Sequence, residues 1–210
     1  AIATDDLAKL TTDQIKALSS TQVAAMTTDQ VAKLSTDQIQ ALSTSAIKGL
    51  STDGIVALTT SQAEKLSTDQ IAALTTAQVK AIATDDLAKL TTDQIKALSS
   101  TQVAALTTDQ VAKLTTDQIQ ALTTSAIKGL TAAGVTALTT SQAEKLTTDQ
   151  IQALSSTQVA AIATDDLQKL STDQIGALTS TQVKGLTTDQ IVALTTSQIE
   201  KLGTDQIAAL

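Results

Sequence analysis

The stretch Leu10–Leu18 reads LTTDQIKAL, and its last eight residues are one copy of the unit from which the chain is built. The unit, (Ser/Thr)-Thr-(Asp/Ser)-Gln-(Ile/Val)-x-(Ala/Lys)-Leu, fills residues 3–210 as 26 consecutive octads. Self-similarity at a short fixed period is typical of a repeat architecture and not of an ordinary globular domain. We number the positions of each octad 1 to 8 from the residue that follows Leu, so that octad 1 begins at Ala3.

Apolar residues stand at positions 5 and 8 of the octad. Position 8 is Leu, Ile or Met in every copy, and position 5 is Ile, Val or Leu except at Ala63 and Ala143. Residues three apart lie on one face of a helix, whereas in a strand they would point to opposite faces. The pattern therefore predicts that each octad is helical.

The polar half of the octad has the features of a helix start. With Thr11 as N-cap, Gln14 has the spacing of a capping box, and Leu10 with Ile15 has the spacing of a hydrophobic staple. Every Asp is at position 3 or 4 and all 14 Lys are at position 6 or 7, so that the charges complement a helix dipole. We expect about seven helical residues in each octad, a length of roughly 10 Å.

These features predict an all-α fold, a solenoid or superhelix of very short helices with one helix in each of the 26 octads. A single continuous helix is the alternative, but its apolar face would turn by roughly 80° per octad and wind around the rod. A pair of hydroxyl residues in each octad also favours interruption, because Ser and Thr prefer helix caps to helix interiors. Helices this short need packing neighbours to be stable in water.

A longer period lies over the octads. The segment Ala1–Leu7 returns with the same sequence at 81–87 and again at 161–167, an interval of 80 residues. We therefore expect a single repeat domain over residues 1–210, made of blocks 1–80 and 81–160 and a partial block 161–210. We interpret the chain as a piece of a longer array, and the near-identity of the first two blocks leaves a consensus-like engineered chain open.

Two irregularities recur in the blocks. The first octad of each block has alanine in place of the N-cap hydroxyl, at Ala3, Ala83 and Ala163. This change costs about 1 kcal/mol, and we expect the following Thr to shift the cap by one residue. Each full block also contains a pair of glycines that lowers helix propensity by roughly 1 kcal/mol per Gly. These pairs are Gly49 with Gly54, and Gly129 with Gly134.

Lysine at position 7 suggests a geometry for the superhelix. Position 7 is Lys in octads 1, 4, 8, 11, 14, 18, 21 and 25, and is Ala or Gly otherwise. If these copies are the ones that face solvent, ten octads make three coils, and one coil takes about 3.3 octads, near 27 residues. Inheritance from a duplicated ancestor, with no geometric meaning, is the alternative.

The composition argues against several classes of function. The chain has no His, Cys, Arg, Pro or aromatic residue, so disulfides and thiolate metal sites are excluded and the compartment is left open. A net charge of −7, dispersed Lys and the lack of stacking residues argue against nucleic acid as a partner. No apolar run approaches the ~20 residues of a membrane span, and the first residues lack the features of a signal peptide.

The adjacent carboxylates are the one candidate for a metal site: Asp5-Asp6, Asp85-Asp86 and Asp165-Asp166. They lack both the Gly-containing loop of an EF-hand and the glycine-rich nonapeptide of calcium-binding arrays, so we interpret them as helix N-terminal charges. The hydroxyl residues have no His or Cys to act as a base, and the seven Gly are scattered singly. We therefore predict no catalytic, cofactor-binding or metal-binding residue, and no enzyme.

Threonine at position 2 suggests a binding function. It recurs in nearly every octad at the first helical position, where its side chain is not needed for capping. A regular ladder of exposed Thr could meet an ordered surface such as ice or a polysaccharide, or a protein partner. The simpler interpretation, which we favour, is a solvated residue of adequate helix propensity.

Runs such as Leu58–Gln62 and Leu106–Val111 resemble the LTTxQxxAL octapeptide arrays of large bacterial repetitive proteins, which are often secreted or surface-exposed. The resemblance covers the whole chain and carries no catalytic motif. It implies a spacer or adhesin-stalk role and a secreted or cell-surface location. It assigns no role to an individual residue.

We expect a structural repeat scaffold or spacer, with a Thr-rich binding module as the alternative. The spacer interpretation predicts that octads can be removed with a change in length alone. No cofactor or specific ligand is predicted. Because no distinct capping repeat is visible, we expect raw ends that favour end-to-end self-association.

Overall fold

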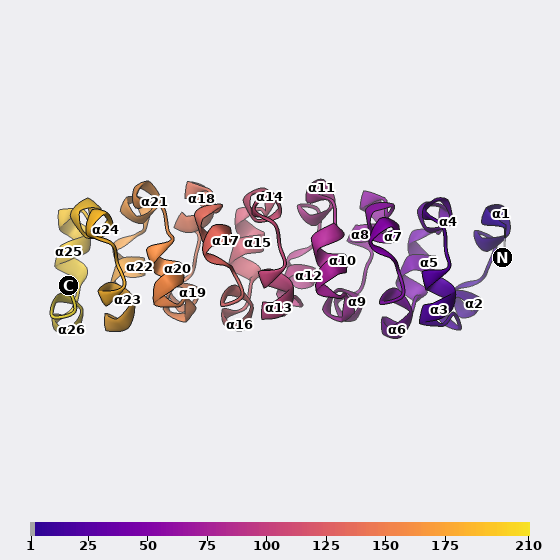
Figure 1. Ribbon diagram of the computed structural model, residues 1–210, viewed down its shortest axis with the longest axis horizontal. Coiled ribbons are helices and arrows are strands. Elements are labelled where there is room, and N and C mark those ends of the chain that lie inside the picture. The colour runs from indigo at the N-terminus through magenta and orange to yellow at the C-terminus, as the bar shows by residue number, and fades with distance from the viewer. Residues whose placement is uncertain (1–2) are drawn as a thin grey trace. The chain divides into compact units, whose positions relative to one another are not determined.

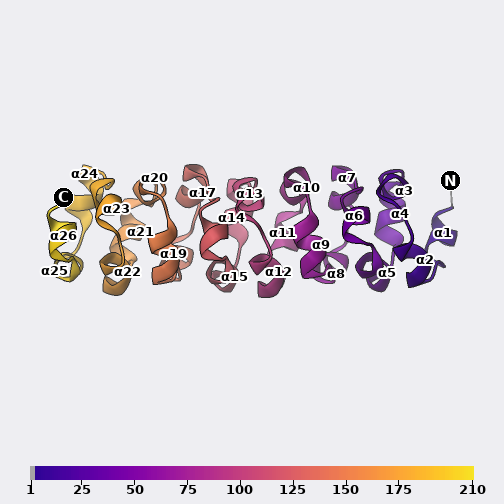
Figure 2. The ribbon, with the colours of Figure 1, turned by 90° about the horizontal axis from the view of Figure 1, so that it is seen from below.

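The computed structural model describes residues 3–210, so that Ala1 and Ile2 lie outside the described residues. These residues form 26 short α-helices and no strand, which confirms the all-α repeat solenoid. Their contacts group into two compact units, Ala1–Leu98 (unit 1) and Ser99–Leu210 (unit 2). Figure 1 shows the helices with the short links that join them, and Figure 2 shows them from a second direction.

Each described octad contributes one helix, and each helix begins at position 2. The helices of unit 1 are α1 Thr4–Leu7, α2 Thr12–Lys16, α3 Ser20–Ala24, α4 Thr28–Lys33, α5 Thr36–Ala41, α6 Thr44–Ile47, α7 Thr52–Val56, α8 Thr60–Glu64, α9 Thr68–Ala73, α10 Thr76–Ala81, α11 Thr84–Leu87 and α12 Thr92–Lys96. The helices of unit 2 are α13 Ser100–Ala104, α14 Thr108–Lys113, α15 Thr116–Ala121, α16 Thr124–Ile127, α17 Ala132–Thr136, α18 Thr140–Glu144, α19 Thr148–Ala153, α20 Ser156–Ala160, α21 Thr164–Lys169, α22 Thr172–Gly176, α23 Ser180–Lys184, α24 Thr188–Ala193, α25 Thr196–Lys201 and α26 Thr204–Ile207.

The helices are shorter than the predicted seven residues. For example, α6 has four residues, α7 has five and α5 has six. The reason is the link, which takes two extended residues. After α4, Leu34 has φ −60° and ψ 139°, and the next N-cap, Ser35, has φ −69° and ψ 161°. No described residue has a positive φ, so the links need no glycine.

A reciprocal pair of hydrogen bonds holds the start of most helices. In α2 the Thr11 N–H donates to Gln14 Oε1 over 2.9 Å, and the Gln14 N–H donates to Thr11 Oγ1 over 3.2 Å. In α9 the same bonds join Ser67 and Gln70 over 2.8 and 3.1 Å. These bonds satisfy N–H groups that a helix start otherwise leaves without a partner.

The core consists of the residues at positions 5 and 8. In α5 and its link, Ile39 is fully buried and Leu42 is 2% exposed. Within each unit, every helix packs against the helix three steps later; α3 packs on α6 and α7 on α10 in unit 1, and α18 packs on α21 in unit 2. The apolar residues of one coil are therefore covered by the next coil, as a solenoid requires.

The glutamine at position 4 joins each coil to the coil before it. Gln70 Nε2 donates to the carbonyl oxygens of Ile39 and Leu42, over 2.9 and 2.7 Å, and lies 3.3 Å from that of Gln40. These carbonyls are at the end of α5, four octads earlier. That of Ile39 also accepts from the Leu42 N–H, whereas the Leu42 carbonyl has its described donor in Gln70. We call this set of bonds from Nε2 the glutamine clamp.

The clamp recurs in both units with nearly constant geometry. In unit 1 it is made by Gln38, Gln62, Gln70, Gln78 and Gln94, whose Nε2 atoms lie 2.6–2.8 Å from the position 8 carbonyl oxygen. In unit 2 it is made by Gln142, Gln150, Gln158, Gln174, Gln182, Gln190, Gln198 and Gln206.

The clamp and the helix packing together give the size of a coil. Helices pack on partners three octads away, whereas the clamp reaches the end of a helix four octads back. One coil therefore takes between three and four octads, the interval that contains the 3.3 octads suggested by the lysine spacing.

The first octad of each block differs from our expectation. Its helix begins at position 2 like the others, and Ala3, Ala83 and Ala163 remain the N-caps without a side-chain cap bond. The predicted shift of the cap by one residue is therefore wrong. The packing of the octad fixes where the helix begins, and the loss of one cap hydrogen bond is too small to move it.

Gly49 stands at a close approach between two coils. A Cβ atom built on Gly49 would lie 2.1 Å from the carbonyl oxygen of Ser20, the first residue of α3. A Cβ on Gly54, in contrast, would lie 3.3 Å from Ser51 Oγ and 3.4 Å from a methyl carbon of Leu50. The first glycine is required by packing, whereas the second is not.

We expect Gln70→Ala to lower the free energy of unfolding by about 2–3 kcal/mol, because it removes the bonds between the coils and leaves the buried carbonyl oxygen of Leu42 without its donor. Gln14→Ala is the matched control, since Gln14 is exposed in the first coil and its described bonds are those of the capping box. The control should cost about 0.5–1 kcal/mol. Urea unfolding of both variants measures the difference, and equal losses would contradict the clamp.

We expect Gly49→Ala to destabilise the protein by about 2 kcal/mol, because the added methyl group would force two backbones apart. Gly54→Ala should be neutral or should stabilise by about 0.5 kcal/mol, because alanine has the higher helix propensity. Thermal unfolding followed by circular dichroism compares the two. The opposite order of melting temperatures would show that the close approach to Ser20 does not exist.

Candidate functional site

The paired carboxylates fall at the starts of α1, α11 and α21. The second member of the later pairs is buried, since Asp86 is 8% exposed and Asp166 is 7% exposed. The first members, Asp85 and Asp165, are exposed. The two carboxylates of a pair therefore point into different surroundings.

Each buried carboxylate accepts a hydrogen bond from the neighbouring coil. Thr60 Oγ1, at the start of α8, donates to Asp86 Oδ1 over 2.6 Å. Thr140 Oγ1, at the start of α18, donates to Asp166 Oδ1 over the same distance. Aspartate thus replaces glutamine at position 4 and forms a different bond between coils, because its shorter side chain carries no amide donor.

The carboxylates do not gather into a larger cluster in the described part of the chain. No group of three or more Asp or Glu side chains comes together among residues 3–210. In the first block Asp6 is exposed, and its carboxylate lies 3.4 Å from Lys9 Nζ in an exposed ion pair. The absence of metal, cofactor and catalytic residues stays a prediction from sequence.

The position 2 threonines are the first residues of their helices and most are exposed. Thr28, Thr52 and Thr68 are exposed, whereas Thr36 and Thr84 are half-buried. Because a coil takes three to four octads, threonines from successive octads point to different sides of a unit. A ladder on one side would draw on every third or fourth octad, with a gap at Ala132 in unit 2.

The lysines are all exposed, including the eight at position 7. In unit 2, Lys201 Nζ lies 3.3 Å from the carboxylate of Asp173, with both side chains more than half exposed. The pair joins α25 to the start of α22, three octads earlier. Exposed pairs of this kind contribute little to stability, and we interpret these lysines as solvated surface charges.

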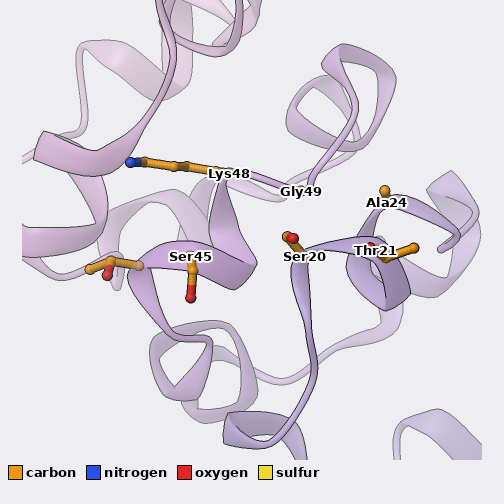
Figure 3. Close-up of a pocket in the computed structure, with 7 residues that line it drawn as sticks. Ser20, Thr21, Ala24, Ser45, Lys48 and Gly49 are labelled. Atoms are coloured by element: carbon orange, nitrogen blue, oxygen red, sulfur yellow. The ribbon is translucent and has the colours of Figure 1, made fainter.

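A surface hollow of about 660 Å³ lies between α3 and α6 in unit 1. Ser20, Thr21, Ser45 and Lys48 line it together with Gly49, and Figure 3 shows Lys48 extending away from Gly49. A hollow of about 540 Å³ recurs in unit 2. It is lined by Ser100, Thr101, Ala104, Ser125, Lys128 and Gly129, which are the same residues 80 positions later.

The hollow is open to solvent and its hydroxyl groups belong to helix starts. Ser43 Oγ, which caps α6, lies 3.1 Å from Ser45 Oγ, so one of these hydroxyls donates to the other. No two ionisable groups face each other among the lining residues, since Lys48 is the single charged residue. We read the hollow as a consequence of the close approach of Gly49 to Ser20.

Sequence reasoning missed the residue that does most for this structure. The capping-box role of glutamine hid its second role, because Gln70 uses Oε1 for the cap and Nε2 for the clamp. One signal was present in the sequence. A capping box accepts Glu as well as Gln, yet no octad has Glu at position 4.

Thr60→Val should lower the free energy of unfolding by about 1–2 kcal/mol, because it removes the donor to a nearly buried carboxylate. The matched control is Thr52→Val, at the same helix position of α7, where the hydroxyl has no side-chain bond and is exposed. Chemical denaturation measures both. If Thr52→Val costs as much as Thr60→Val, the bond to Asp86 contributes nothing.

The chain was compared with known proteins and protein families. A family model described as the ALTTAQ repeat matches residues 1–36, 31–68, 79–116, 111–148 and 159–196, most of the chain. The letters ALTTAQ occur in the sequence at Ala73–Gln78. No curated protein matched. In the described residues, no helix has the length and apolar character needed to cross a membrane.

Proposed function

Because the chain belongs to the ALTTAQ repeat family, we propose that it is a structural scaffold or spacer segment, with no catalytic activity. The octapeptide resemblance suggests a stalk in a bacterial secreted or surface protein, and we include this in the proposal. End-to-end self-association stays a prediction.

The glutamine clamp is the observation that supports this function most. Each clamp satisfies the end of one helix with the side chain of a helix in the next coil, as Gln150 does for the carbonyls of Ile119 and Leu122. The pattern of clamps recurs with each 80-residue block, so adding a block adds the same bonds each time. Stability in such an array is a sum of repeat and nearest-neighbour terms. The number of octads can therefore change, and with it the length, while the local contacts stay the same.

The surface supports a spacer in a second way. The exposed side chains are mainly small hydroxyls, Ala, Asp, Glu, Lys and Gln, and the large exposed apolar residues in the described part are few: Val56, Val192, Ile207 and Leu210. A surface without a broad apolar patch offers little for a tight protein partner. A chain of this kind separates other domains without binding them.

The test is removal of one complete block. Deletion of residues 81–160 keeps the octad register, because Lys80 is then followed by Ala161 as it was by Ala81. A spacer predicts unchanged ellipticity per residue and a maximum dimension, from X-ray scattering, reduced by roughly the 80/210 of the chain that is lost. Deletion of residues 81–156 is the control, since it breaks the register and should lower helicity and stability. Equal behaviour of the two deletions would contradict the proposal.

A binding module is the second candidate, and the exposed position 2 threonines favour it. Replacement of Thr28, Thr52 and Thr76, exposed threonines spaced three octads apart, by Ala should then reduce binding to a polysaccharide or thermal hysteresis with ice, with the fold unchanged by circular dichroism. A spacer predicts no thermal hysteresis and no retention on polysaccharide columns for either protein.

A further inference from the structure

The glutamine clamp is interrupted at regular intervals. Position 4 has no glutamine at residues 6, 46, 86, 126 and 166, which are forty residues apart, nor at the glycines 54 and 134. Asp86 and Asp166 replace the clamp with a bond from a threonine hydroxyl, as described above. Ala46, Gly54 and Gly134 have no side chain that could form any such bond.

In unit 1 the gap covers two consecutive octads. The clamp spacing shows which carbonyls receive no glutamine donor, since glutamine reaches the residues 31, 30 and 28 positions earlier. For position 46 these residues are Ile15, Lys16 and Leu18, at the end of α2. For position 54 they are Val23, Ala24 and Met26, at the end of α3. The gap is bounded by the clamps of Gln38 and Gln62.

The same octads also have weaker helix starts. In α6 the Ala46 N–H donates to Ser43 Oγ over 3.1 Å, and no side chain returns a bond to the Ser43 N–H. In α7 the Gly54 N–H donates to Ser51 Oγ over 3.0 Å, again without a return bond. Glycine inside a helix also loses more conformational entropy on folding than other residues. Residues 43–58 thus lack both hydrogen bonds that position 4 supplies elsewhere.

We propose that this segment is a built-in opening point, where neighbouring coils of unit 1 separate before any clamped pair of coils. Where octads 6 and 7 pack on octads 2 and 3, position 4 supplies no hydrogen bond between the coils. Separating these two coils therefore breaks fewer hydrogen bonds than separating a clamped pair. In unit 2 the same spacing counted back from Gly134 gives Val103, Ala104 and Leu106, and octad 17 is the equivalent opening point. The order of opening follows from the hydrogen bonds and holds whether or not the chain is a spacer.

Amide hydrogen exchange of the full chain tests the proposal. The position 5 amides are matched reporters, because Ile47, Ile55 and Ile71 each donate to a serine N-cap carbonyl over 2.9 Å. Differences in their exchange therefore report opening and not the local bond. We expect the Ile47 and Ile55 amides to exchange at least about tenfold faster than the Ile71 amide, since one net hydrogen bond changes an opening equilibrium by roughly this factor.

Two sets of variants move the opening point. Gln62→Ala with Gln70→Ala extends the gap from octads 6 and 7 through octads 8 and 9, and should raise the exchange of Ile71 to that of Ile47. Gln14→Ala with Gln22→Ala removes two capping boxes that lie outside any clamp, and should leave Ile71 unchanged. Ala46→Gln should slow exchange at Ile47 about tenfold.

Equal exchange at Ile47, Ile55 and Ile71 in the parent chain would overturn the proposal. An unchanged Ile71 after the loss of Gln62 and Gln70 would overturn it as well. If Ala46→Gln does not fold, the comparison of the two double variants decides, because both retain the parent sequence at residues 43–58.

Discussion

One side chain, the glutamine at position 4, uses both ends of its amide to build this structure. Its oxygen accepts from the N-cap at the start of its own helix, and its nitrogen donates to carbonyls at the end of a helix in the preceding coil. In unit 1, Gln70 does this while 2% exposed. Every short helix has unsatisfied groups at both ends, and a helix of four to six residues consists almost entirely of ends. The amide solves this problem for two helices at once.

The clamp explains how the chain folds without aromatic side chains in its core. The sequence has no aromatic residue, and the core contains Ile, Val, Leu and Ala at positions 5 and 8. Helices of this length are unstable in isolation, so local propensity cannot hold them. Packing of each helix on the helix three steps away buries the apolar face, and the clamp satisfies the polar groups that this packing removes from water. Neither alone would suffice.

The sequence predicted the fold class, the single helix in each octad and its starting position, because these depend on local spacing. The helix length was overestimated, since the two extended residues of each link, such as Leu34 and Ser35, leave no signal in a periodicity of apolar residues. The clamp was missed because it joins residues 28–31 positions apart, and nothing in one octad indicates the distance to the next coil. Lysine spacing alone carried that information, in the interval of 3.3 octads. The burial of Asp86 was also unpredictable, since it depends on Thr60 of another coil.

The proposed function follows from the repetition of one set of contacts between coils. Each unit contains the same bonds many times over, and the departures from the repeat at Gly49 and Asp86 have structural reasons that do not require a ligand. This arrangement supports a scaffold whose length is set by the number of blocks and whose coils separate first at defined octads. Its length and stability depend on the hydrogen bonds and the apolar packing between neighbouring coils.

The most direct measurement of the central claim is the stability of Gln70→Glu beside that of Gln14→Glu. Glutamate keeps the capping box in both variants but cannot donate to the carbonyls of the preceding coil. Urea unfolding at pH 7 should show a loss of about 3 kcal/mol for Gln70→Glu and less than about 0.5 kcal/mol for Gln14→Glu. Burial raises the pKa of the carboxyl group introduced at position 70, so its loss relative to the parent should be smallest at acid pH and should grow as the pH rises through that pKa. Equal, pH-independent losses for the two variants would contradict the clamp as the bond that holds the coils together.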